Sequence, residues 1–134
     1  MLDEDRGIVR LEQQIAAPPA KVWEALTTPG LHAKWWAAGD IAAEPGHRFE
    51  LDMGRFGQQP CEILEAVEHR KLRYSFGPSW TLAWEVEEND GGTRLVLEHS
   101  GFDLQDPQGR FAFTAMGAGW RDEVLPRLAR LVEG

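Results

Sequence analysis

The stretch LRYSFGPSWTLAWEVEENDGGTRLVLEH, residues 72–99, alternates apolar and polar side chains and is divided by two turn signals. A period of two is typical of strands that bury one face of a sheet. Gly77-Pro78 separates the first two segments, and the Asn-Asp-Gly-Gly run at 89–92, a strong hairpin signal, separates the last two. The stretch therefore predicts three consecutive antiparallel strands.

Further strands are predicted upstream of this stretch. Residues 47–53 alternate, residues 60–67 form a largely apolar run, and a glycine-containing hairpin joins them, which extends the pattern to a five-stranded meander. Residues 8–15 alternate in the same way and predict a sixth strand, with Gln13 as a polar exception on its inner face.

Helical patterns occupy three segments. Residues 19–26 and 31–36 predict two short helices, the first of which begins at a proline. Residues 108–132 place apolar side chains every three or four positions, which is typical of a long helix packed on one face. Pro126 lies inside this pattern and should kink or interrupt the helix near Asp122, because proline lacks a backbone N–H.

The order of these elements predicts an α+β fold in a single domain, residues 1–134. A curved six-stranded antiparallel sheet with one apolar face must be covered, and the long C-terminal helix is the only predicted element that is long enough. We therefore expect the sheet, the two short helices and the long helix to enclose a hydrophobic cavity.

The amino-acid composition disfavours two classes of binding partner, nucleic acids and membranes. Fourteen basic and 22 acidic residues give a net charge of −8, which disfavours a nucleic acid bound through its phosphates and an anionic membrane surface. No apolar run approaches the roughly 18 residues of a membrane span, so membrane insertion is not expected. The single cysteine, Cys61, and the acidic start at residues 1–5, which is unlike a secretory signal, predict a cytoplasmic protein.

The sequence is unusually rich in tryptophan, with six Trp against one Tyr. Strand and helix parity place many large rings in the expected space between sheet and helix, where they either wall a pocket for a flat aromatic or polycyclic molecule or pack as a solid core. Both interpretations stay open. The candidate ligand-binding residues are Trp36, Phe49, Leu51, Tyr74, Phe76, Trp80, Trp84, Leu97, His99, Phe113, Met116, Gly117 and Trp120.

Few polar groups are expected to face that space: Gln13, Cys61, Tyr74 and His99. His99 and Tyr74 have side chains that suit acid or base chemistry, but a buried histidine is more often a hydrogen-bonded core residue, so no catalytic residue is assigned. The four histidines lack metal-ligand spacing and no nucleotide-binding motif is complete, so we expect neither a metal nor a cofactor.

Three segments resemble one family. Residues 22–29 (VWEALTTP) followed by Trp35-Trp36, residues 98–102 (EHSGF), and Gly119-Trp120 resemble the signature segments of bacterial proteins similar to the C-terminal domain of the activator of Hsp90 ATPase. The segments occur in the same order and cover nearly the whole chain. That family belongs to the START-like superfamily, which is also called polyketide cyclase-like or Bet v 1-like.

The resemblance implies a helix-grip fold that holds a hydrophobic ligand, such as a lipid, between sheet and long helix. The inward aromatic side chains, with few polar groups among them, favour a non-catalytic binder of a small hydrophobic, aromatic or polycyclic molecule. The alternatives are a polyketide cyclase or dehydratase that uses His99 or Tyr74, and a co-chaperone-like protein with a role in the stress response. A chaperone partner is less expected because such co-chaperones carry a second domain, and a homodimer through an edge strand stays open.

Overall fold

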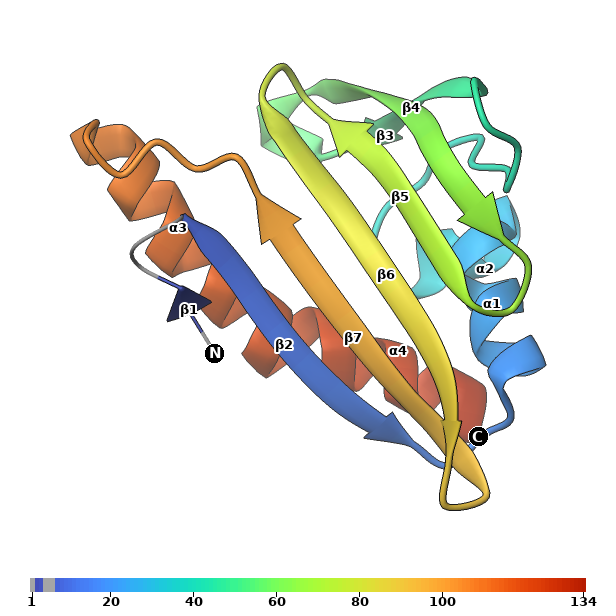
Figure 1. Cartoon of the computed structure of the whole chain (residues 1–134). Coiled ribbons are helices and arrows are strands. Elements are labelled where there is room, and N and C mark those ends of the chain that lie inside the picture. The colour runs from blue at the N-terminus through green and yellow to red at the C-terminus, as the bar shows by residue number, and fades with distance from the viewer. Residues whose placement is uncertain (1, 4–6) are drawn as a thin grey trace.

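The computed structural model describes residues 2–3 and 7–134. Met1 and residues 4–6, which include part of the acidic start used to predict a cytoplasmic location, lie outside the described residues. One curved antiparallel sheet has helices packed against a single face (Figure 1). Its strands are β1 (Leu2–Asp3), β2 (Ile8–Ile15), β3 (Arg48–Asp52), β4 (Gln58–Val67), β5 (Lys71–Phe76), β6 (Trp80–Asn89) and β7 (Gly92–Ser100).

The strand order is β1-β2-β7-β6-β5-β4-β3, and every neighbouring pair is antiparallel. The six predicted strands and the five-stranded meander are confirmed, and the two-residue β1 adds a short strand beside β2. The pairing of β2 with β7 brings the start of the chain next to the last strand of the meander. This arrangement confirms the predicted α+β, helix-grip architecture.

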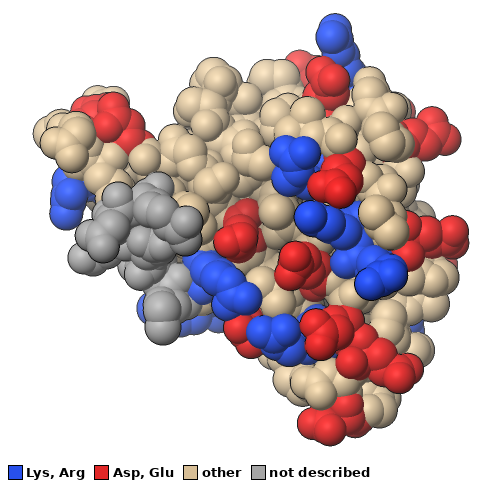
Figure 2. Space-filling view, in the orientation of Figure 1, with Lys and Arg blue, Asp and Glu red and all other residues tan. Residues whose placement is uncertain are grey.

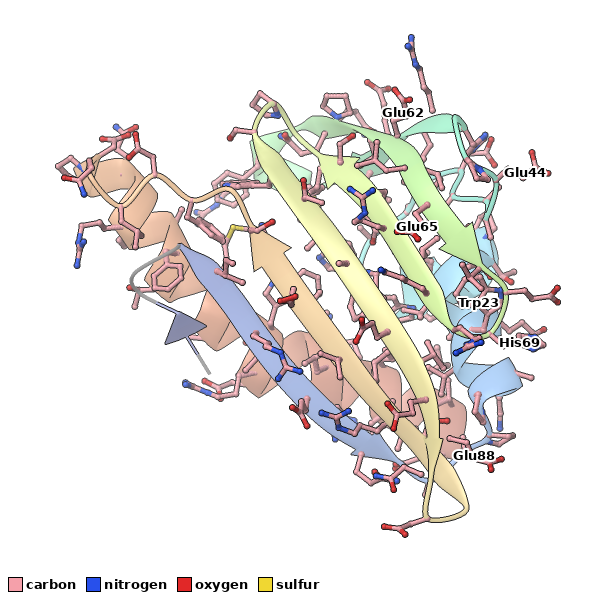
Figure 3. The ribbon with its side chains drawn as sticks, in the orientation of Figure 1. Trp23, Glu44, Glu62, Glu65, His69 and Glu88 are labelled. Carbon is pink, nitrogen blue, oxygen red and sulfur yellow. The ribbon has the colours of Figure 1, made fainter. Side chains whose placement is uncertain are left out.

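The turns follow from backbone conformations that the sequence makes accessible. Asp90 and Gly91 both have positive φ, 52° and 77°, and close the β6–β7 hairpin as the Asp-Gly signal predicts. His69, at φ 63°, lies in the β4–β5 turn, and its ring meets the edge of Trp23 with centroids 6.4 Å apart (Figure 3). The tryptophan of the first helix therefore packs on the turn at one end of the sheet.

The helices are α1 (Pro19–Thr27), α2 (Pro29–Trp35), α3 (Pro107–Gly119) and α4 (Leu125–Glu133), with a 3₁₀ turn, η1, at Gly54–Phe56 and a π-helical turn, η2, at Trp120–Val124. Proline occupies the first turn of all four α-helices, and in α1, α2 and α3 its missing N–H costs nothing because the helix starts there. Asp106 caps α3, because its side chain accepts a hydrogen bond from the Gln108 N–H.

The predicted interruption of the C-terminal helix near Asp122 is confirmed. The helix changes there into the π-helical turn η2, and the Leu125 N–H bonds to the Trp120 carbonyl five residues earlier. Pro126 has no N–H to donate to Asp122, and its ring would clash with that carbonyl in an α-helix, so one widened turn is the accommodation. Trp120 is the first residue of this π-helical turn.

The two faces of the sheet differ in chemistry. Acidic and basic side chains are interspersed on the face away from the helices (Figure 2), and Arg94 bridges Glu12 at 2.9 Å and Glu87 at 3.5 Å there. The other face carries the buried apolar residues of the strands. Within the residues that the structure describes, no helix is long and apolar enough to cross a membrane.

Candidate functional site

The sequence-predicted site residues lie in the layer between the sheet and the helices. Trp36, Trp80 and Met116 are half-buried and reach the edge of that layer. The others are buried: Phe49, Leu51, Tyr74, Phe76, Trp84, Leu97, His99, Phe113, Gly117 and Trp120. All thirteen are therefore on the inner side of the molecule, and their apolar side chains belong to one hydrophobic cluster.

Most of the rings meet in one network, which we call the ring cluster. Trp36 packs on Trp120 with ring centroids 4.7 Å apart and on Phe76 at 5.3 Å, and Phe76 stacks on Trp80 at 5.8 Å. Ring contacts of 4.6–6.1 Å link the remaining members. The ring cluster comprises Trp35, Trp36, Phe76, Trp80, Trp84, His99, Phe102, Phe113 and Trp120.

Phe49 and Tyr74 pack on each other with ring centroids 5.8 Å apart, and Tyr74 connects this pair to the ring cluster through Trp84. The Tyr74 hydroxyl accepts a hydrogen bond from the Trp84 indole N–H at 3.2 Å, and burial raises the pKa of the phenol above its usual value. Tyr74 thus stays protonated at ordinary pH and serves as a hydrogen-bond partner for a buried indole. Leu51 is fully buried on β3 and forms an isolated bridge with Gly39.

His99 is fully buried among the rings of Phe76, Trp80, Phe102 and Trp120. The Trp120 indole N–H donates to its Nδ1 at 3.0 Å, and because an indole nitrogen only donates, the neutral imidazole carries its own proton on Nε2. Among the described residues, that Nε2 has no hydrogen-bond partner. Burial lowers the pKa of His99 to about 3, so the ring is neutral at ordinary pH.

His32 is a second buried histidine, and the sequence analysis did not single it out. Its Nδ1 donates to the Ala37 carbonyl at 2.6 Å, which leaves a bare lone pair on Nε2, again without a partner in the described part of the chain. Burial lowers its pKa. His32 lies three and four residues before Trp35 and Trp36, a helical spacing that would have placed it beside them.

The two other polar candidates do not join the ring cluster. Gln13 is half-buried opposite Leu95, and its amide donates to the Gln14 carbonyl at 3.3 Å. Cys61 is buried, and the loss of water raises the pKa of its thiol to about 12, so it behaves as a small apolar residue. No group of three or more His, Cys, Asp and Glu side chains among the described residues could hold a metal ion.

The amino-acid sequence matches a known protein family. The sequence profile of the family described as "Activator of Hsp90 ATPase homolog 1-like protein" matches residues 16–133. The chain belongs to this family. Its match spans both short helices, the meander and the C-terminal helix, as the resemblance in the signature segments predicts.

Solved structures from several bacteria share the fold of this family member. Protein MLL2253 from Mesorhizobium loti is 29% identical, with a TM-score of 0.84 over 93% of this chain and 96% of that one. Protein BH1534 from Bacillus halodurans is also 29% identical, with a TM-score of 0.84 over 94% and 96%. DynU16, a protein of the dynemicin biosynthetic locus, is 26% identical with a TM-score of 0.79 over 95% of this chain and 47% of its own.

No curated protein is significantly similar to the sequence. The shared fold is of a ligand-binding type, in which the sheet and the C-terminal helix face each other across an apolar layer. In this chain the ring cluster fills that layer under α3 and η2.

Proposed function

We propose that this protein binds a small hydrophobic, aromatic molecule in the ring cluster, between the sheet and the C-terminal helix. The observation that carries the proposal is the Nε2–H of His99, a fully buried donor with no partner among the described residues. A buried donor without an acceptor costs on the order of 1–3 kcal/mol, and each such group in a folded protein calls for an explanation. A ligand atom that accepts a hydrogen bond from this N–H would explain the unpaired donor.

Trp36 is the ring that we expect a ligand to displace. It is half-buried, it follows the end of α2, and the segment that leads from it to β3 has little regular structure. Connecting segments move more readily than the elements they join. Trp35 is held in place by contrast, because it is fully buried and its indole N–H donates to the Ala25 carbonyl at 2.9 Å.

A catalytic role is not part of this proposal. The lone pair on His99 Nδ1 already accepts from Trp120, and a pKa of about 3 leaves too little imidazolium at ordinary pH for acid catalysis. The raised pKa of Tyr74 likewise keeps its proton in place. The polyketide cyclase-type alternative would therefore require both rings to rearrange. We place the binder in the cytoplasm, in line with a single buried thiol.

The test is native mass spectrometry of the protein with a panel of aromatic polyketides, flavonoids, sterols and fatty acids. We expect a one-to-one adduct of unchanged ligand mass with an aromatic member of the panel. Trp36→Ala should bind the same molecule as tightly or up to about tenfold more tightly, because the ligand no longer has to displace an indole. The matched control is Leu131→Ala, a half-buried position on α4 outside the ring cluster, which should leave binding unchanged.

Two outcomes would contradict the proposal. The absence of any adduct with either protein would show that the rings are core alone. An adduct seen only with Trp36→Ala would show that Trp36 belongs to a permanently closed core and that the substitution created the site. A product of altered mass would instead favour the enzyme alternative, and the same spectra give the oligomeric state.

A further inference from the structure

We infer that this chain forms a two-fold symmetric dimer through the end of the sheet at which Phe56 and Phe111 are exposed. The partner is a second copy of the chain. The hairpin tip of each copy, Gly54–Phe56, packs on the start of α3, residues 103–111, in the other copy. The inference does not depend on the proposed ligand, because it concerns side chains on the outside of the molecule.

The two most exposed large apolar side chains of the described residues lie at this end. Phe56 is 69% exposed and Phe111 is 75% exposed. Each follows an arginine in the sequence, Arg55 and Arg110. Aromatic and arginine side chains are enriched at protein interfaces and carry much of the binding energy there. The two Arg-Phe pairs are therefore the surface features that best suit a protein partner.

Each phenylalanine is presented by a hydrogen-bonded element. The Gln59 amide donates to the Phe56 carbonyl at 2.9 Å and holds the tip against the start of β4. Phe111 lies in the first turns of α3, where the Arg110 guanidinium donates to the Leu104 carbonyl at 3.1 Å. Docking elements that are already ordered costs little conformational entropy.

The β5–β6 turn, residues 77–79, lies between these two elements. The strand order places this turn between the β3–β4 tip and the end of β7, and all three lie at the same end of the sheet (Figure 1). The Gly77 N–H donates to the Pro60 carbonyl of β4 at 2.9 Å, and Gly101, after β7, packs on the Ser79 carbonyl. A two-fold axis through this turn brings the tip of each copy to the α3 start of the other.

The charges on either side of this turn are complementary. On the tip, the Arg55 guanidinium lies over the Phe56 ring, 5.1 Å from its centroid. The α3 start carries two exposed carboxylates, Asp103 and Asp106, and its guanidinium, that of Arg110, donates to a carbonyl of the same loop. Within the described part of the chain, neither Arg55 nor the two aspartates form an ion pair. The tip of one copy therefore supplies a cation to the acidic α3 start of the other.

Like charge is the main obstacle to association, because the net charge is −8 and two copies repel each other. The β5–β6 turn at the centre of the proposed contact, Gly-Pro-Ser, is uncharged. Asp52 is the carboxylate nearest the tip in the sequence, and one of its oxygens accepts the Gly54 N–H at 2.9 Å. Two-fold symmetry forms each favourable contact twice. An end-on contact of this kind is small, so we expect a dissociation constant in the micromolar range.

The two edges of the sheet suit a second copy less well. On one edge, β1 pairs with the first two residues of β2, and Glu133 accepts the Ala16 N–H at 2.9 Å where β2 ends. On the other edge, Gly39 forms a bridge with Leu51 of β3. Covered edges resist the addition of a further strand. We therefore expect the dimer to form through the turns and not through an edge strand.

Sedimentation velocity from about 5 µM to about 500 µM tests the dimer, and the wild-type protein should pass from monomer to dimer within that range. Phe56→Ser and Phe111→Ser should each weaken dimerisation by about tenfold or more, because each removes one ring from both symmetric contacts. The matched control is Val67→Ser, a 44% exposed apolar position at the other end of β4, which should leave dimerisation unchanged.

Charge reversal tests which two surfaces meet. Arg55→Asp and Asp103→Arg should each stay monomeric over the same range, because each homodimer would oppose like charges at both contacts. An equimolar mixture of the two variants should dimerise again, since an arginine and an aspartate then meet at each contact. A wild-type protein that is monomeric at about 500 µM, or a mixture that fails to dimerise, would overturn the inference.

A measurement on the wild-type protein guards against variants that fail to fold. Nitrogen-15 NMR on dilution should shift the backbone amide signals of the tip, the β5–β6 turn and the α3 start, and leave those of the β4–β5 turn in place. Concentration-dependent shifts confined to the edge of β2 or β3 would overturn the inference and assign the dimer to an edge strand. Both measurements use protein without ligand, so the proposed function is tested separately.

Discussion

The layer between sheet and helices has two ends that are built differently. The end under α4 is aliphatic and closed: α4 contacts β2, α1 and α2, and six aliphatic side chains buried there are at most 3% exposed. The end under α3 and η2 is aromatic, with half-buried rings at its edge and a buried nitrogen, His99 Nε2, that lacks a partner in the described chain. The closed, aliphatic residues are Ile15, Val22, Leu26, Leu125, Leu128 and Val132.

The difference between the two ends indicates that they have different roles. Apolar groups that fill their space and leave no polar atom unpaired contribute stability without specificity. A buried ring with an unpaired donor or acceptor lowers the stability of the folded protein, and a ligand that supplies the missing hydrogen bond removes this cost. Such locally unfavourable features are typical of functional sites. The aliphatic end should therefore control folding and the aromatic end should control binding.

The largest effect that tests this division is expected from Leu128→Ala at the aliphatic end. Leu128 is fully buried on α4, and truncating a buried leucine costs about 2–5 kcal/mol. Urea unfolding followed by circular dichroism should show that loss, with ligand affinity unchanged under conditions where the variant is folded. Leu131→Ala, half-buried on the same helix, should cost clearly less. A Leu128→Ala protein as stable as wild type would remove the distinction between the two ends.

An intermediate effect is expected at the aromatic end when the pH falls. The pKa of His99 is about 3 in the folded protein because of burial, while an unfolded histidine titrates near 6.5. Below pH 6.5 the unfolded state binds a proton that the folded state does not, so stability falls as the pH is lowered from about 6.5 towards 3. The slope reaches about 1.4 kcal/mol per pH unit for this group.

This pH dependence is measured by urea unfolding between pH 7 and pH 5. His99→Asn should make the loss of stability over that range shallower, because the titrating ring is gone. The matched control is Leu131→Ala, which removes no titrating side chain and should leave the slope unchanged. An identical slope in His99→Asn and wild type would mean that His99 gains a proton in the folded protein as readily as in the unfolded one.

The amino-acid sequence predicts the fold of this protein better than its candidate binding site. Alternation and turn chemistry in residues 72–99 suffice for three strands, and Pro126 suffices for the interrupted helix, because both depend on local backbone rules. β1 escaped prediction because two residues carry no periodicity. The first strand of the hairpin ends in a 3₁₀ turn, and β4 begins at Gln58, two residues before the predicted start.

The site is harder to predict because it depends on contacts between distant segments. Strand parity places His99 inward, but only the approach of Trp120 fixes which nitrogen carries the proton. His32 looks like an ordinary polar position in a short helix until the Ala37 carbonyl and the two adjacent tryptophans bury it. The polarity of the two rings is thus a property of the fold, and periodicity does not reveal it.

The smallest effect is expected on the outer face of the sheet, away from both ends of the layer. Hydrogen bonds from Arg94 and Arg10 lower the pKa of Glu12 to about 2, yet Glu12 and Arg10 are solvent-exposed and Arg94 is only half-buried. Exposed ion pairs contribute little because water and salt screen them. Arg94→Gln should therefore raise the pKa of Glu12, as measured by carbon-13 NMR of its carboxyl group, while the urea midpoint stays close to that of wild type. Arg94→Gln and Leu128→Ala alter no common contact. If Arg94→Gln lowered the free energy of unfolding as much as Leu128→Ala, the outer face of the sheet would stabilise the fold as much as the aliphatic end does.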